Sequence, residues 1–109
     1  SGTLVDSAPA LVLAGSLHPT AAICGTPTGR AKSLIKELEQ MDRNRYTGPV
    51  GWINAKGDGE LGIALRCAEV IENNARLFAG CGIVSESTPK DELAESDAKF
   101  AAMKDALTN

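Results

Sequence analysis

Three ionisable residues near the end of the chain have a spacing that would place two carboxylates and an ammonium on one face of a helix. Glu92, Glu95 and Lys99 fall at positions i, i+3 and i+7, so a helix would carry all three on one face. Two carboxylates and an ammonium held together in this way could form a functional site. The same pattern also fits a solvated helix face with an i,i+4 ion pair, which contributes only ~0.3–0.5 kcal/mol.

The residues around this group predict the helix that positions it. Thr88 is a good N-cap, Pro89 suits the first helical position, and Asp91 places negative charge in the first turn, where the helix dipole favours it. A separate apolar stripe at helical spacing indicates the buried face of the same helix. Its members are Leu93, Phe100, Met103 and Leu107.

Upstream, the pattern predicts two helices separated by a loop. The apolar residues that follow Pro9, from Leu11 to Leu17, favour a short helix. His18–Pro27 contains two prolines and a glycine, which predicts an ordered loop with at most one short strand. Apolar residues at helical spacing predict an amphipathic helix over Gly29–Met41, and Asp42–Gly48 reads as a polar connection.

Two hairpins are expected next, which gives an α+β fold. The predicted strands cover Val50–Ala55, Glu60–Ile71 and Arg76–Val84, with turns at Lys56–Gly59 and at Asn73-Asn74. On the long middle strand, Arg66 would share a face with small residues, which leaves room for a ligand beside it. An Arg66 side chain that only extends into solvent is an equally good interpretation. The edges of a three-stranded antiparallel sheet would be bare, so we expect residues outside this chain to complete the sheet.

Composition excludes several classes of function. The net charge of −3, with both signs interspersed, gives no basic footprint for nucleic acid. No apolar run approaches the ~18–20 residues of a membrane span. The three cysteines are odd in number and contain no C-x-x-C, which argues against a disulfide framework or a zinc site and for a reducing cytoplasm. A lone histidine before proline, His18, is more typical of a structural hydrogen bond than of catalysis.

Several motifs together resemble the chorismate-utilising enzymes. A-G-C-G-I-V at 79–84, S-x-P at 87–89 and E-L-A-E-x-x-x-K at 92–99 are similar to the segment that closes these enzymes. H-P-T-x-A at 18–22 with G-x-P at 25–27, and Leu77-Phe78, resemble the isochorismate synthase branch. R-x-x-Y-x-G at 43–48, P-V-G-W at 49–52, G-D-G-E at 57–60 and A-L-R at 64–66 extend the resemblance, which runs from Leu11 to Leu107. It implies that residues 1–109 are the C-terminal segment of one chorismate-binding domain of the anthranilate synthase component I type, with its upstream part absent.

The resemblance also implies a binding site for chorismate and one Mg²⁺. It makes Glu95 a metal ligand, with Glu92 in a supporting or water-mediated role, and it gives Arg66 and Lys99 the task of holding the substrate carboxylates. Gly80 and Gly82 would let backbone N–H groups approach the ligand. Two further positions would line the substrate: Ala22 and Tyr46.

The activity implied is Mg²⁺-dependent isomerisation of chorismate to isochorismate, for menaquinone or siderophore synthesis. The family's general base, a lysine, and its general acid, a glutamate, both lie upstream of the matched region, so the chain alone should be inactive and should need the remainder of the enzyme. Alternatives are another chorismate enzyme, such as salicylate or anthranilate synthase, or a non-catalytic module that binds acids or another protein. Cys81, where the family usually has alanine, and Gly62, where a bulkier residue is common, depart from the family pattern.

Overall fold

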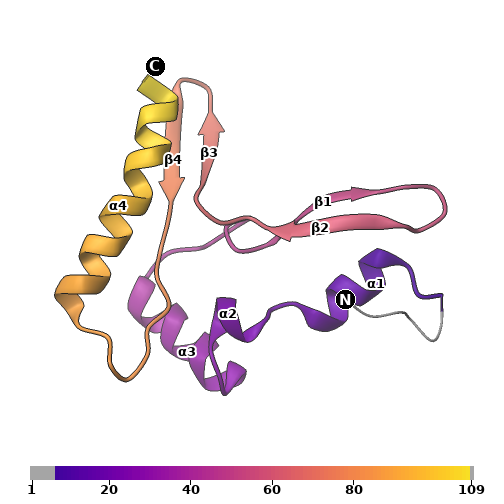
Figure 1. Ribbon diagram of the computed structural model, residues 1–109, viewed down its shortest axis with the longest axis horizontal. Helices are drawn as coiled ribbons and strands as arrows, with labels where there is room; N and C mark the ends of the chain where they lie inside the picture. The colour runs from indigo at the N-terminus through magenta and orange to yellow at the C-terminus, as the bar shows by residue number, and fades with distance from the viewer. Residues whose placement is uncertain (1–6, 109) are drawn as a thin grey trace. The chain divides into compact units, whose positions relative to one another are not determined.

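A computed structural model describes residues 7–108 of the chain. The chain divides into two compact units, residues 1–64 and residues 65–109, and each unit is described by itself (Figure 1). Each unit combines helical structure with a short antiparallel sheet. The predicted α+β class is therefore confirmed.

The first unit contains a hairpin that packs against a short helix. Helix α1 (Ala10–Leu17) follows Pro9, as predicted. Strands β1 (Pro49–Ile53) and β2 (Gly59–Ile63) pair antiparallel from Pro49 opposite Ile63 to Ile53 opposite Gly59. The Asn54 side chain shapes the turn between them, because its Oδ1 accepts the N–H groups of Lys56 and Asp58 at 2.9 and 3.0 Å. The hairpin is tied to α1 through this turn, where the Ala10 N–H donates to the Gly57 carbonyl at 2.9 Å.

Two more helices of this unit lie before the hairpin. Helix α2 (Ala21–Cys24) occupies the segment that was expected to be a loop with a strand, so the strand prediction is wrong there. The helix is only four residues long and ends where Gly25 adopts a φ of 69°, too short to show a helical period in the sequence. Helix α3 (Thr28–Glu39) confirms the predicted amphipathic helix and ends at Gln40, which is left-handed.

The second unit is a hairpin followed by a long helix. Strands β3 (Cys67–Ile71) and β4 (Asn74–Phe78) pair antiparallel, and helix α4 (Pro89–Thr108) contacts β4. Of the predicted apolar stripe, Phe100 and Met103 are half-buried, whereas Leu93 and Leu107 stay exposed.

Both boundaries of the second hairpin differ from the prediction. The turn lies one residue earlier than expected, at Glu72 and Asn73, and Glu72 takes the left-handed φ of 53°. The last strand ends at Phe78 and does not continue to Val84. Residues 79–88 instead form the irregular connection to α4.

The long middle strand predicted over Glu60–Ile71 is interrupted. Arg66 has a φ of 46°, which cannot continue an extended strand. The ladder of β1 and β2 reaches only as far as Ala64, whose N–H donates to the Gly48 carbonyl at 2.9 Å. The described residues therefore form two separate two-stranded sheets, and the three-stranded meander is wrong.

Few side chains in the described residues are buried. Phe78 and Cys24 are 5% and 7% exposed, while many large apolar side chains remain open to solvent, including Trp52 at 58% and Ile83 at 72%. No helix in the described part of the chain is both long and apolar enough to span a bilayer.

Candidate functional site

The start of α4 is fixed by Thr88, as the sequence predicts. The Asp91 N–H donates to the Thr88 hydroxyl at 3.3 Å, and this hydroxyl donates in turn to the Asp91 carboxylate at 2.7 Å. The Glu92 N–H donates to the Thr88 carbonyl at 3.1 Å. The Thr88 hydroxyl thereby caps one of the backbone donors that the first turn of a helix leaves free. It holds the turn that carries Glu92 in one conformation.

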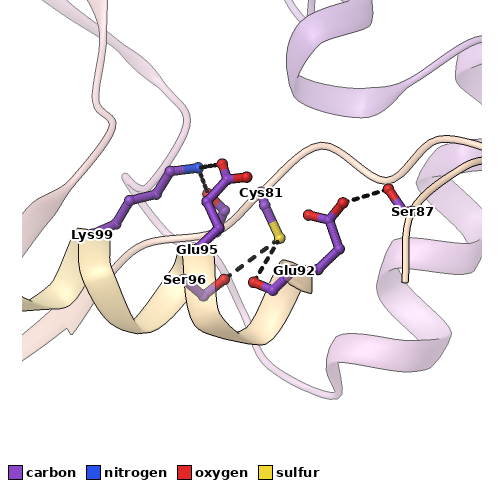
Figure 2. A network of polar contacts seen from close by, with 7 residues as sticks. Cys81, Ser87, Glu92, Glu95, Ser96 and Lys99 are labelled. Atoms are coloured by element: carbon purple, nitrogen blue, oxygen red, sulfur yellow. Dashed lines mark hydrogen bonds and ion pairs between the residues drawn. The ribbon is translucent and has the colours of Figure 1, made fainter. Parts of the chain in front are cut away.

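Lys99 connects the helix to the glycine-containing segment that follows β4. Its Nζ donates to the Gly80 carbonyl at 2.8 Å and forms an ion pair with Glu95, one turn earlier on α4 (Figure 2). The Lys99 side chain is 19% exposed and that of Glu95 is 54% exposed. The i,i+4 pair expected from the spacing is therefore present. An ammonium has three donors, and these two contacts use two of them.

Glu92 lies on the same face and is held at both its backbone and its side chain. The Ser87 hydroxyl donates to Glu92 Oε1, while the other oxygen, Oε2, is buried and has no hydrogen-bond partner. Behind it, the Cys81 thiol donates to the Glu92 backbone carbonyl and contacts the Ser96 hydroxyl, both at 3.5 Å (Figure 2).

The Glu92 carboxyl and the Cys81 thiol shift each other's pKa. The neighbouring Cys81 thiol and the hydrogen bond from Ser87 hold the pKa of the Glu92 carboxyl below its ordinary value. Glu92 in turn raises the pKa of the Cys81 thiol. At neutral pH, Glu92 is therefore a carboxylate and Cys81 a thiol.

This arrangement fits part of a site for a hard divalent cation. Glu92 and Glu95 supply carboxylate oxygens, and the unpartnered Oε2 of Glu92 is an acceptor that a cation would satisfy. Within residues 7–108, no group of three or more histidine, cysteine, aspartate or glutamate side chains gathers in a way that could hold a metal ion. Further ligands would have to come from water, substrate or another part of the protein.

The remaining predicted residues of the second unit lie outside this network. Arg66 is exposed in the bend between β2 and β3, so its predicted place on a strand face of small side chains is wrong. Gly82 is exposed, and a Cβ built there would meet no atom within 4 Å. Packing in the described residues therefore does not require glycine at this position.

Ala22 and Tyr46 belong to the first unit. Ala22 is exposed on α2. Tyr46 lies beside Arg43, whose guanidinium carbon is 5.7 Å from the centre of the Tyr46 ring. Arg43 also forms two hydrogen bonds to Glu39, at 2.5 and 2.8 Å, and donates to the Ile23 carbonyl at 3.4 Å. This arginine therefore links α2, the end of α3 and the tyrosine.

Sequence reasoning missed three of the residues that shape these sites. Arg43 belongs to the motif R-x-x-Y-x-G, and Ser87 belongs to the motif S-x-P. The motifs alone assigned neither residue a role. Cys81 was noted only as a departure from the family pattern. Its contact with the backbone of Glu92 has no signal in the sequence, because the two residues are brought together by the irregular segment before α4.

Comparison with known proteins identifies what the chain is related to. Residues 1–108 match the family described as chorismate binding enzyme. Isochorismate synthase DhbC of Bacillus subtilis is 50% identical over 107 residues, which are 97% of this chain and 27% of that protein. The vibriobactin-specific isochorismate synthase of Vibrio cholerae is 52% identical over 91 residues, which are 84% of this chain and 23% of that protein.

The solved structures agree with this relationship. The crystal structure of DhbC from Bacillus anthracis superimposes with a TM-score of 0.93 at 50% identity, covering 97% of this chain and 29% of that one. The chain thus spans about a quarter of the length of the relatives it matches. Since the family match covers nearly every residue, the chain belongs to the chorismate binding enzymes.

Proposed function

We propose that this chain is the C-terminal segment of an isochorismate synthase, in which it holds the substrate carboxylates and forms part of a Mg²⁺ site. The observation that carries the proposal is the network on one face of α4, where Glu92, Glu95 and Lys99 lie together against the segment containing Gly80. The isochorismate synthases among the relatives, at 50% and 52% identity, support the assignment of the reaction.

Substrate binding in this proposal relies on two cations. Chorismate carries two carboxylates, and Lys99 and Arg66 are each assigned to one of them. Lys99 is suited to this task because Gly80 and Glu95 already fix its position and leave a donor to spare. Arg66 can form two parallel hydrogen bonds with a carboxylate. Gly80 and Gly82 would let backbone N–H groups approach the ligand, and Ala22 and Tyr46 would line its ring.

Glu95 and Glu92 would hold the Mg²⁺ in this enzyme. When bound, the ion would neutralise negative charge on the substrate as a hydroxyl leaves one ring carbon and water adds at another. The chain's own residues would bind and orient the substrate. The general base and general acid are expected from the part of the enzyme that precedes this segment, so the chain by itself would lack the proton-transfer pair.

Two other functions remain as alternatives to test. A salicylate synthase would share the first step and then eliminate pyruvate, so its product would differ. A non-catalytic module would bind an acid or a partner protein and convert nothing.

A chimera tests the proposal, because it supplies the upstream part of the enzyme from which the general base and general acid are expected. In it, the 109-residue chain replaces the matching segment of Bacillus subtilis DhbC. The purified chimera should convert chorismate to isochorismate only when Mg²⁺ is added, with the products identified by chromatography. Salicylate and pyruvate as products would favour the salicylate synthase alternative. A chimera that unfolds cooperatively on heating but leaves chorismate unchanged would favour the non-catalytic module.

A further inference from the structure

We propose that Ser87 is a positioning residue for the cation site. Its hydroxyl holds one carboxylate oxygen of Glu92, and the other oxygen is thereby presented to the divalent cation. The inference rests on the proposed function, since it concerns the same cation site. It adds a residue outside the set that was assigned to bind metal or substrate.

The hydroxyl of Ser87 is oriented by the turn in which it lies. The Val84 N–H donates to Ser87 Oγ at 3.1 Å, and the Ser87 N–H donates to the Val84 carbonyl at 3.1 Å. Because the hydroxyl oxygen already accepts a hydrogen bond from the backbone, its own proton is directed away from Val84. That proton is donated to Glu92 Oε1 (Figure 2).

Glu92 is consequently fixed at three points. Its N–H donates to the Thr88 carbonyl, its own carbonyl accepts the Cys81 thiol, and its Oε1 accepts the Ser87 hydroxyl. Only Oε2 remains, and it is buried without a partner in the described structure. A buried carboxylate oxygen without a partner is unfavourable, so the arrangement favours the approach of a cation.

A neighbouring serine provides a matched control. Ser85 lies two residues earlier in the same connection and also donates to a carboxylate, Glu86 Oε1, at 2.6 Å. Both Ser85 and Glu86 are exposed. Replacing Ser85 therefore removes a similar hydrogen bond without disturbing the candidate site.

The test compares S87A, S87T and S85A in the chimera described above, which contains the whole chain. Binding of Mn²⁺, as a probe for Mg²⁺, is measured by calorimetry without substrate, and isochorismate formation is measured across a Mg²⁺ titration. Loss of a residue that orients a ligand typically weakens metal affinity by ~10–100-fold. We expect S87A to weaken Mn²⁺ binding at least about tenfold and to raise the Mg²⁺ concentration needed for half-maximal activity by the same factor. At saturating Mg²⁺, the kcat of S87A should return to that of the parent chimera. S87T, which keeps the hydroxyl, should bind like the parent, as should S85A.

The possible results separate this inference from the function on which it rests. Mn²⁺ binding by S87A that equals that of S85A would overturn the role of Ser87 and leave the metal site intact. Equal loss in S87A and S87T, or unfolding of S87A alone, would show that Ser87 serves the turn and not the carboxylate. Absence of Mn²⁺ binding in the parent chimera would overturn the metal assignment together with this inference.

Discussion

Replacing Lys99 by methionine separates a role in binding from a role in the fold. Methionine keeps the aliphatic stem of this mostly buried side chain and removes the ammonium. Two contacts are lost, the ion pair with Glu95 and the hydrogen bond to Gly80. The pair is partly exposed and of the i,i+4 type, worth ~0.3–0.5 kcal/mol, and water can reach the exposed Gly80 to replace the lost donor. The free energy of unfolding should therefore fall by less than about 1 kcal/mol.

The expected effect of K99M on substrate binding is much larger. Truncating one partner of a desolvated charge pair typically costs ~2–5 kcal/mol, and ~1.4 kcal/mol corresponds to a factor of ten. Chorismate binding should thus weaken by at least about thirtyfold. Calorimetric titration of the chimera with chorismate measures this, and thermal unfolding checks the fold. K104M is the matched control, since Lys104 is an exposed lysine on the same helix. Normal chorismate affinity in folded K99M would refute the role of Lys99 in holding a substrate carboxylate. A large fall in the free energy of unfolding would refute the expectation that the ion pair with Glu95 and the hydrogen bond to Gly80 contribute little to stability.

Four further substitutions probe the remaining assignments. E95Q keeps the shape of a proposed ligand but removes its charge, so isochorismate formation should collapse and modest extra Mg²⁺ should not restore it; normal turnover would refute the assignment. R66G removes the guanidinium from a residue with a left-handed backbone conformation, which glycine adopts without strain. The free energy of unfolding should hold or rise, while chorismate affinity should drop by an order of magnitude or more. Unchanged chorismate affinity would contradict the role of Arg66 in holding a substrate carboxylate. T88A should lower the free energy of unfolding by ~1 kcal/mol through loss of the cap, whereas T108A at the far end of α4 should have little effect. E92Q removes the carboxylate that raises the pKa of the Cys81 thiol, so the thiolate fraction of Cys81 should increase. Iodoacetamide should then alkylate Cys81 faster at pH 8, as followed by mass spectrometry. An unchanged alkylation rate would contradict the influence of Glu92 on the pKa of Cys81.

Local signals were sufficient to predict α4, which carries Glu92, Glu95 and Lys99, and the amphipathic helix α3, but not the four-residue helix α2. Thr88 and Pro89 located the start of α4, and the helical spacing of apolar residues located α3. Alternation and turn residues also predicted both hairpins. Their limits were predicted less well, because a residue such as Arg66 can adopt a left-handed conformation that its side chain does not reveal. The same applies to Glu72, which moved the second turn by one residue.

The site was predicted in part. Spacing alone placed Glu92, Glu95 and Lys99 on one face, and the ion pair between the last two follows from a four-residue separation. The contacts of Glu92 with Ser87 and Cys81 depend on the path of residues 79–88, which have no periodic pattern. Such contacts need coordinates, because irregular backbone brings side chains together without a repeat in the sequence.

The central claim is that this chain binds and orients the substrate and holds part of the Mg²⁺ site, but does not supply the groups that transfer protons. Its most direct test is isochorismate formation by the purified 109-residue chain, incubated with chorismate and Mg²⁺ beside the chimera. A missing general acid or base forfeits ~10²–10⁴-fold in rate, so we expect product from the chimera and none above background from the chain alone. Robust turnover by the isolated chain would place the acid and base among its own residues and contradict the claim.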